Sequence, residues 1–177
     1  MQVISANASE YVIRIANING TEEEFVSVIR QPDKNFVYFS FKEQPHQKVC
    51  EADKETWHLM FTRYKTWVTA LGTTIPYNVT GVFLNPEGIS CTKLENVPFE
   101  QITYEQVKNL SLSTQRDVIG YQWKGFDFDF TNGNYKIFSN WTYIIKDASG
   151  RFYKMRFLDF YDANHHKGYP KLEYQKL

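Results

Sequence analysis

A histidine and a methionine lie two residues apart in the stretch WHLMFTRY, at positions 58 and 60. Imidazole and thioether side chains both bind soft or borderline metal ions. The stretch alternates like a β-strand, in which such positions share a face with Cα atoms about 7 Å apart. His58 and Met60 would therefore need further ligands to hold an ion. We interpret them as part of the outward face of a strand whose Trp57, Leu59 and Phe61 face the core.

Two other pairs of residues have side chains suited to chemistry. His165 and His166 are adjacent, so on an extended chain their rings point in opposite directions and cannot chelate one ion. Asp127 and Asp129 lie about 7 Å apart on one strand face, a separation that overlaps those of glycosidase carboxylates. Those enzymes hold their carboxylates on opposite sides of the scissile bond, which neighbours on one strand cannot do. We therefore interpret the two aspartates as a solvated face.

The sequence contains no motif typical of an enzyme. It has no nucleophile elbow, zinc-protease helix, P-loop or dinucleotide fingerprint. Lysine plus arginine balance aspartate plus glutamate at 20 each, so no net charge draws the whole chain toward nucleic acid or an anionic membrane. We predict a protein that is not an enzyme and that recognises its partner by shape and local chemistry.

Length and composition indicate one mainly β domain. The 177 residues suffice for one well-cored domain, and the 14 Phe and 12 Tyr residues favour strands. No apolar run approaches the roughly 20 residues of a membrane span, and residues 1–30 lack the apolar core of a signal peptide. If the protein is exported, we expect that its leader has been removed and that Met1 is an added start. Whether Cys50 and Cys91 pair is left open.

The elements that must position these residues are mostly strands. The clearest prediction is a hairpin over 140–161, because Gly150 can take the positive φ that its loop needs. We also predict strands at 36–41, 126–130 and from Tyr135, and a strand, turn and strand over 77–91 that forms a second hairpin. Short helices are predicted at 22–29 and after Thr103, where Gln106 completes a capping box, with irregular helical structure over 113–118.

Several of these segments follow one another in a specific order. They are YFSF at 38–41, WHLMFTRY at 57–64, YNVTGVFLNPEGI at 77–89, and GRFYKMRFLDFYD at 150–162 followed by KGYPKLEY. This order resembles that of the HmuY family, the haem-binding surface lipoproteins of anaerobic Gram-negative bacteria.

The resemblance runs from about Lys34 to Tyr174 and implies a fold, a task and a location. The implied fold is a single antiparallel β-rich domain with a few short helices over residues 34–177, on which residues 1–33 pack as an N-terminal segment. The implied task is hemophore-like haem binding for iron acquisition. The implied location is the outer-membrane surface, with a lipid anchor, or secretion. A TonB-dependent outer-membrane receptor is the implied partner.

The sequence departs from the family pattern at the haem ligands. Family members grip haem between two protruding loops with axial His or Met side chains, and these loops correspond here to about 104–118 and 126–136. Between Phe61 and Lys154 the chain has no histidine or methionine. Neither usual ligand can therefore be carried over to this sequence.

Three explanations remain open. Haem iron also accepts tyrosinate or thiolate, which Tyr104, Tyr121, Tyr135 or Cys91 could supply; Tyr104 and Tyr135 are the preferred axial candidates because they border predicted loops, with Arg116 as a cation that favours ionisation. Alternatively, haem stacks on aromatic side chains without a strong ligand; the candidates are Trp123, Trp141 and Phe128. In the third, the scaffold is a binding module for another apolar or glycan ligand.

Overall fold

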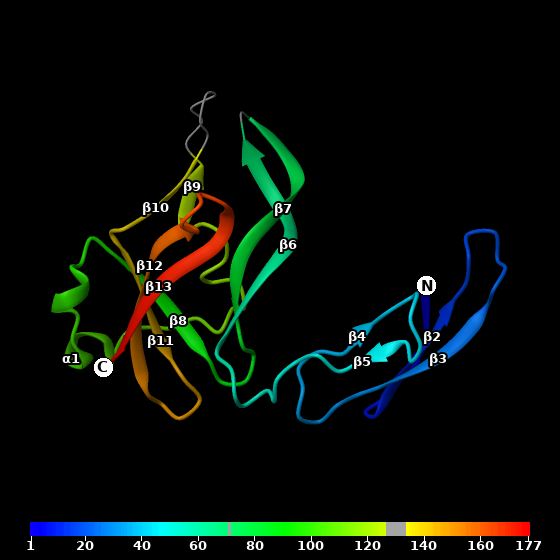
Figure 1. Cartoon of the computed structure of the whole chain (residues 1–177). Helices are drawn as coiled ribbons and strands as arrows, with labels where there is room; N and C mark the ends of the chain where they lie inside the picture. The colour runs from blue at the N-terminus through cyan, green and yellow to red at the C-terminus, as the bar shows by residue number, and fades with distance from the viewer. Residues whose placement is uncertain (71, 127–133) are drawn as a thin grey trace. The chain divides into compact units, whose positions relative to one another are not determined.

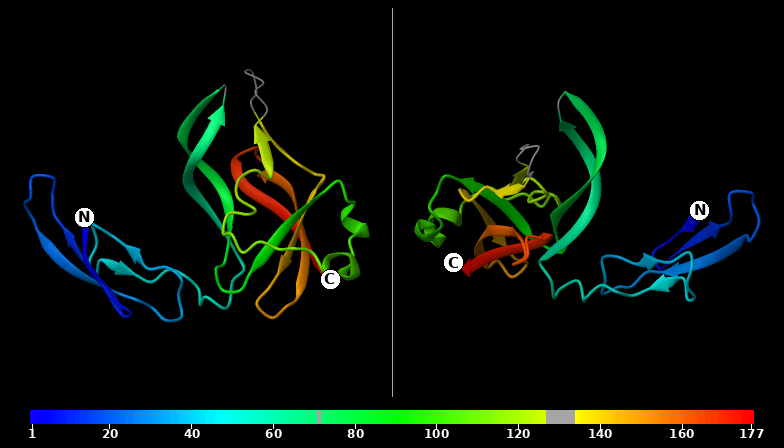
Figure 2. Two further views of the ribbon diagram at one scale, coloured as in Figure 1. Left: turned by 180° about the vertical axis from the view of Figure 1, so that it is seen from behind. Right: turned by 45° about the horizontal axis from the view of Figure 1, so that its top comes forward.

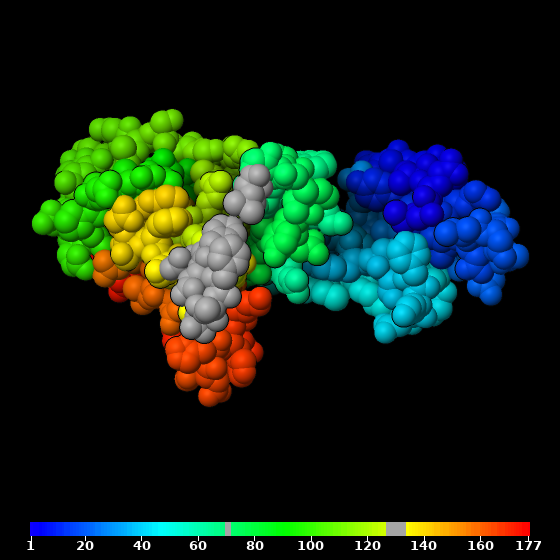
Figure 3. Space-filling model, turned by 90° about the horizontal axis from the view of Figure 1, so that it is seen from above, coloured from blue at the N-terminus to red at the C-terminus, as the bar shows by residue number. Residues whose placement is uncertain are grey.

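The computed structural model describes residues 1–70, 72–126 and 134–177. It is mainly antiparallel β structure with short helical segments (Figure 1), so the predicted fold class is confirmed. Its contacts divide the chain into two compact units, Met1–Trp57 and His58–Leu177 (Figure 3). Among the described residues, no helix is long and apolar enough to cross a membrane.

The boundary between the units lies after Trp57, whereas the sequence predicted one at residue 33. Residues 34–57 thus belong to the first compact unit by their contacts. That residues 1–33 pack on the remainder of the chain stays a prediction.

The first unit contains a three-stranded antiparallel sheet in the order β1-β2-β3 and a small two-stranded sheet of β4 and β5. The strands are β1 (Gln2–Ala6), β2 (Glu10–Ile15), β3 (Glu24–Ile29), β4 (Tyr38–Phe39) and β5 (Gln47–Lys48). The strand predicted at 36–41 is therefore present, but only two of its residues are paired.

The helix predicted at 22–29 is wrong, because β3 occupies most of that segment. In EFVSVI, Val26 and Val28 share one face and Phe25, Ser27 and Ile29 share the other. Val28 is buried and Val26 half-buried, whereas the other three are exposed. This period of two suits a strand with one dry side.

His46 is the buried polar centre of the first unit. Its ring stacks on Phe39, with 5.2 Å between centroids. Nδ1 lies 2.7 Å from the Ser40 carbonyl oxygen, and Nε2 lies 3.1 Å from Oε2 of Glu24 on β3. The histidine therefore links the small sheet to the three-stranded sheet. The Ser40 carbonyl, and then the Glu24 carboxylate, raise the pKa of His46.

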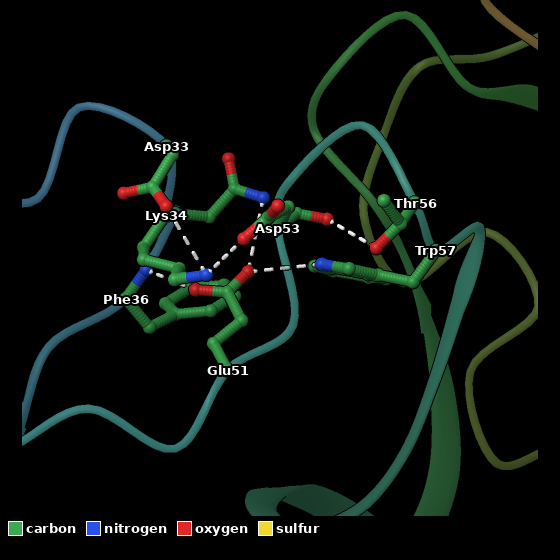
Figure 4. Close-up of polar contacts among 8 residues, drawn as sticks. Asp33, Lys34, Phe36, Glu51, Asp53, Thr56 and Trp57 are labelled. Atoms are coloured by element: carbon green, nitrogen blue, oxygen red, sulfur yellow. Dashed lines mark hydrogen bonds and ion pairs between the residues drawn. The ribbon is translucent and has the colours of Figure 1, made fainter.

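A polar cluster joins the C-terminal segment of the first unit to residues 34–36 (Figure 4). Glu51 accepts hydrogen bonds from the Phe36 backbone N–H at 2.6 Å, from Trp57 Nε1 at 3.0 Å and from the Asn35 side-chain amide at 3.1 Å. Nearby, the Lys34 ammonium pairs with Asp53. These bonds hold the outgoing segment against residues 34–36, since one carboxylate satisfies three donors.

The second unit is built around a four-stranded antiparallel sheet in the order β13-β12-β11-β8, with two further hairpins, β6–β7 and β9–β10 (Figure 1). Its elements are β6 (Leu59–Ala70), β7 (Thr73–Leu84), β8 (Ser90–Glu95), η1 (Phe99–Gln101), α1 (Tyr104–Val107), β9 (Lys124–Phe126), β10 (Tyr135–Ile137), β11 (Trp141–Lys146), β12 (Phe152–Tyr161) and β13 (Lys167–Lys176).

The main core lies between this sheet and the base of β7. Trp123 stacks on Phe157 with ring centroids 3.9 Å apart, and Phe160 meets Trp123 edge-on. The other fully covered side chains around them are apolar, which is the main source of stability. They include Val82, Leu84, Cys91, Tyr143 and Met155. A smaller cluster lies beneath α1 and contains Ile102, Val107, Ile144 and Phe152.

The two predicted hairpins have different outcomes. The hairpin β11–β12 is confirmed, with Gly150 at φ +80° in its loop. Strands also flank the turn at Pro86 and Gly88, but they do not pair with each other, because β7 pairs with β6 and β8 pairs with β11. A local turn pattern cannot show that the chain passes between two sheets at this point.

The capping box at Thr103 is confirmed, since its backbone N–H donates to Gln106 Oε1 at 2.9 Å. The irregular helical structure predicted over 113–118 is wrong, because this segment is a β-bridge at Ser113 followed by a turn. The face assignment of β6 is also wrong beyond Leu59. Phe61 is exposed, whereas Tyr64 on the other face packs on Phe83 with centroids 4.4 Å apart.

Candidate ligand site

Tyr135 begins β10 and sits among aromatic rings. It pairs with Phe126 of β9, and the two ring centroids lie 5.1 Å apart. Its other neighbour is Phe160 of β12, at 5.2 Å. The Tyr135 backbone N–H donates to the hydroxyl of Tyr161 at 2.7 Å, which ties the start of β10 to the end of β12. Backbone and ring are therefore held while the side chain stays half-buried.

A buried cation, Lys124, lies beside this aromatic cluster. Its ammonium donates to the Thr80 carbonyl oxygen at 2.6 Å and to the Tyr121 carbonyl oxygen at 3.3 Å, so it joins β9 to β7. The nitrogen also lies 4.1 Å from the Trp123 ring centroid and 5.6 Å from that of Tyr135. No carboxylate in the described part of the chain pairs with it. Burial lowers the pKa of Lys124 to about 8.

A second phenol, Tyr77 of β7, lies near Tyr135. Burial raises the pKa of Tyr135, and the neighbouring phenols of Tyr77 and Tyr161 raise it further. Tyr77 and Phe126 are exposed, at 51% and 43%. Tyr77, Phe126 and Tyr135 together present ring surface and two phenol groups, and we call them the β7–β10 aromatic surface. The Phe126 and Tyr135 rings contact each other, and Tyr77 is linked to Tyr135 through its electrostatic effect.

This surface suits a flat apolar ligand that carries a hard metal ion. Aromatic faces and edges pack against planar rings, and the phenol oxygen of Tyr135 is a hard donor that fits ferric iron. The phenol does not ionise by itself at neutral pH, because its pKa is raised rather than lowered. A bound metal cation would favour the ionised form, and the Lys124 ammonium lies 5.6 Å from the centre of the ring. The residues present thus fit haem.

Tyr104, the other preferred candidate, lies elsewhere in the unit. It is 46% exposed at the start of α1, where its ring meets Phe152 edge-on with centroids 5.6 Å apart. Phe152 begins β12, whereas Phe160, the neighbour of Tyr135, lies eight residues along the same strand. That distance is about 26 Å, and Figure 2 shows α1 and β10 at opposite ends of the sheet. Tyr104 and Tyr135 cannot bind one iron ion together.

Trp123 and Trp141 offer little ring surface to a ligand. Trp123 is only 1% exposed, because Phe157 stacks on its ring and the Lys124 ammonium lies over it. Trp141 is stacked on Phe138 with centroids 4.5 Å apart. Trp123 thus has a structural place in the core, and the stacking role suggested by the sequence does not fit its position.

Arg116 and Tyr121 lie in the segment between α1 and β9, which hydrogen-bonds to β7. The Arg116 guanidinium lies 5.1 Å from the Phe83 ring centroid, and its carbonyl accepts a hydrogen bond from the Leu84 N–H. Tyr121 contributes its carbonyl oxygen to Lys124. The cation that the structure places over the Tyr135 ring is therefore Lys124 instead of Arg116.

The two cysteines lie in different surroundings. Both are free thiols; Cys50 is exposed and Cys91 is fully buried. Burial raises the pKa of Cys91 to about 12, so the thiolate that would bind iron is disfavoured. His58 is exposed just before β6, with its ring 6.4 Å from that of Tyr153, and Met60 is half-buried.

The remaining candidates lie in loops. His166 pairs through Nδ1 with Asp162 at 2.9 Å, and His165 has a positive φ of 62°. Asp127, Phe128 and Asp129 lie outside the described residues. Across residues 1–70, 72–126 and 134–177, no group of three His, Cys, Asp or Glu side chains could hold a metal ion.

Sequence reasoning missed Lys124 and Tyr77. Lys124 stands between Trp123 and a predicted strand rich in Phe, and a lysine among apolar residues is a pattern that could have indicated a buried cation. Tyr77 lies in a predicted strand, and no feature of the sequence distinguishes it from the other tyrosines as a site residue. Only the folded chain brings it near Tyr135.

The fold is that of a mainly antiparallel β protein in which two hairpins stand beside a four-stranded sheet. The chain belongs to the HmuY family, because the family model described as HmuY protein matches residues 32–174. The resemblance expected from about Lys34 to Tyr174 is confirmed. This family is one of binding, hemophore-like proteins.

Comparison with solved structures finds a crystal structure of a Bacteroides fragilis protein provisionally designated a lipoprotein. It has 13% sequence identity and a TM-score of 0.38, and the match covers 97% of this chain and 91% of that chain. No curated protein matches the sequence.

Proposed function

We propose that the protein binds haem, or a similar planar apolar ligand, on the β7–β10 aromatic surface, with the Tyr135 oxygen as ligand to ferric iron. The single observation that carries this proposal is the position of Tyr135. Its phenol is half-buried between Phe126 and Phe160, has a second phenol nearby and lies beside the Lys124 ammonium. Family membership supports haem as the ligand.

The role that follows is hemophore-like haem acquisition at the cell surface. By family membership, we propose a lipid anchor at the outer-membrane surface, or secretion, and transfer of the ligand to a TonB-dependent receptor. The protein acts as a binder and not as an enzyme in this proposal. In this proposal the Tyr135 phenolate would take the place of the His or Met ligand of the family, because neither residue occurs between Phe61 and Lys154.

A haemin titration tests the proposal. Purified protein should give a saturable, red-shifted Soret band at equimolar haemin. Tyr135→Phe keeps the ring packing and removes only the oxygen, so this variant should lose the shifted band. Tyr104→Phe is the matched control and should behave as the wild type, since Tyr104 lies at the other end of β12. Unshifted spectra with wild-type protein would favour another apolar or glycan ligand.

The titration should also depend on pH. The Tyr135 phenol must lose its proton to bind iron, and its pKa is raised above the ordinary value of 10. Affinity should therefore increase with pH, by about tenfold per unit at neutral pH, because one proton is released on binding. Binding that is independent of pH would indicate that Tyr135 is not the ligand.

A further inference from the structure

The β6–β7 hairpin carries a long uncharged segment with charged residues only near its base. Residues 66–86 contain no Asp, Glu, Lys or Arg, although nearly a quarter of the whole chain is charged. The two strands pair with each other from Leu59 and Leu84 to Ala70 and Thr73. Figures 1 and 2 show this hairpin extending away from the four-stranded sheet.

The outer part of the hairpin exposes large apolar side chains. Trp67 is 69% exposed on one face, and Tyr77 and Ile75, which pair with Thr66 and Val68, are about half exposed on the other face. Among the described residues, no strand other than its partner pairs with either strand over this stretch. Two-stranded hairpins are marginal by themselves in water, and exposed apolar surface does not help the chain to fold. This part of the hairpin therefore exposes apolar surface that is available to a partner.

Two cations lie on the same exposed face as Trp67. Phe61, Arg63, Lys65 and Trp67 alternate along β6, and all four are exposed, whereas the residues between them are half-buried. Their cross-strand neighbours are uncharged; these are Val82, Thr80, Asn78 and Pro76. Within the described residues, no ion pair includes Arg63 or Lys65. Although the whole chain has no net charge, Arg63 and Lys65 thus form a local stripe of positive charge between the rings of Phe61 and Trp67.

We propose that this face of the β6–β7 hairpin docks on an anionic lipid bilayer, with Trp67 at the interface and Arg63 and Lys65 against lipid phosphates. Trp and Tyr are enriched at membrane interfaces because they combine an apolar ring with a polar tip. Basic side chains beside them are attracted to anionic headgroups. This proposal does not depend on haem binding.

Vesicle flotation with the full chain tests this proposal. The probe is a set of vesicles of phosphatidylglycerol and phosphatidylcholine, compared with vesicles of phosphatidylcholine alone. Wild-type protein should float with the anionic vesicles and lose most of that binding at high salt, since salt screens the attraction. R63Q/K65Q should bind about 25-fold more weakly, because each cation near the surface contributes about fivefold. Trp67→Ser should also weaken binding.

A matched control uses another exposed aromatic and lysine. Tyr174→Ser with Lys176→Gln changes β13, where Tyr174 is 70% exposed, and should leave flotation unchanged. All these positions are at the surface, so the variants should fold, which circular dichroism checks. The proposal is overturned if wild-type protein fails to float, floats equally with neutral vesicles, or floats equally well after R63Q/K65Q.

Discussion

Replacing Lys124 with methionine should remove a pH dependence of stability that the wild type shows in mild alkali. Burial lowers the pKa of Lys124 from 10.5 to about 8. Between these values the unfolded chain binds more protons than the folded chain, so the free energy of unfolding rises with pH. The full gain, for a difference of about 2.5 pKa units, is about 3 kcal/mol. Between about pH 7.5 and pH 9.5 it is about 2 kcal/mol.

Methionine retains the apolar stem of Lys124 but has no ammonium. It relieves the cost of burying a charge, yet it leaves the carbonyl oxygens of Thr80 and Tyr121 without their donor. These effects oppose each other at neutral pH. The slope of stability against pH therefore tests the reasoning better than stability at one pH.

The assay is urea unfolding followed by tryptophan fluorescence, which reports mainly on the second unit because three of the four tryptophans lie there. Measurements stop near pH 9.5, before tyrosine ionisation adds its own effect. Lys176→Met, at an exposed position of β13, is the control and should keep the wild-type slope. A Lys124→Met variant with the wild-type slope would refute a buried, perturbed ammonium.

Three further predictions concern other parts of the chain. The Ser40 carbonyl raises the pKa of His46, so the stability His46 gives is fully present below about pH 6.5 and is lost as pH rises through the folded pKa; NMR titration of its ring should give a value above 6.5. A thiol reagent should modify Cys50 at once and Cys91 only on unfolding, because Cys91 is buried with its pKa raised to about 12; two fast thiols would contradict this. Gly81→Ala should destabilise the second unit by about 1–3 kcal/mol in urea unfolding, since a Cβ there would lie 2.7 Å from a backbone oxygen.

The fold was predictable where the pattern is local. The β11–β12 hairpin has aromatic alternation and Gly150 at the one position that needs a positive φ. The turn at Pro86 and Gly88 is equally local, and it was located correctly. Its strands nevertheless join different partners, because sheet pairing depends on contacts far apart in the sequence.

The candidate site was predictable only in part. Tyr135 borders a loop and is half-buried, so its sequence position indicated accessibility. Lys124 and Tyr77 could not be assigned to the same site, because the bond that joins β9 to β7 runs from the Lys124 side chain to the carbonyl of Thr80, 44 residues away. Conversely, Trp123 has a ring of the kind that stacks on ligands. Only the packed core shows that Phe157 already covers this ring.

The most direct test of haem binding at Tyr135 is a crystal structure of the protein grown with haemin, with anomalous diffraction recorded at the iron edge. The proposal predicts an iron peak in contact with the Tyr135 oxygen, with the porphyrin against Phe126 and Tyr77. An iron peak beside Tyr104, or in contact with neither tyrosine, would contradict it.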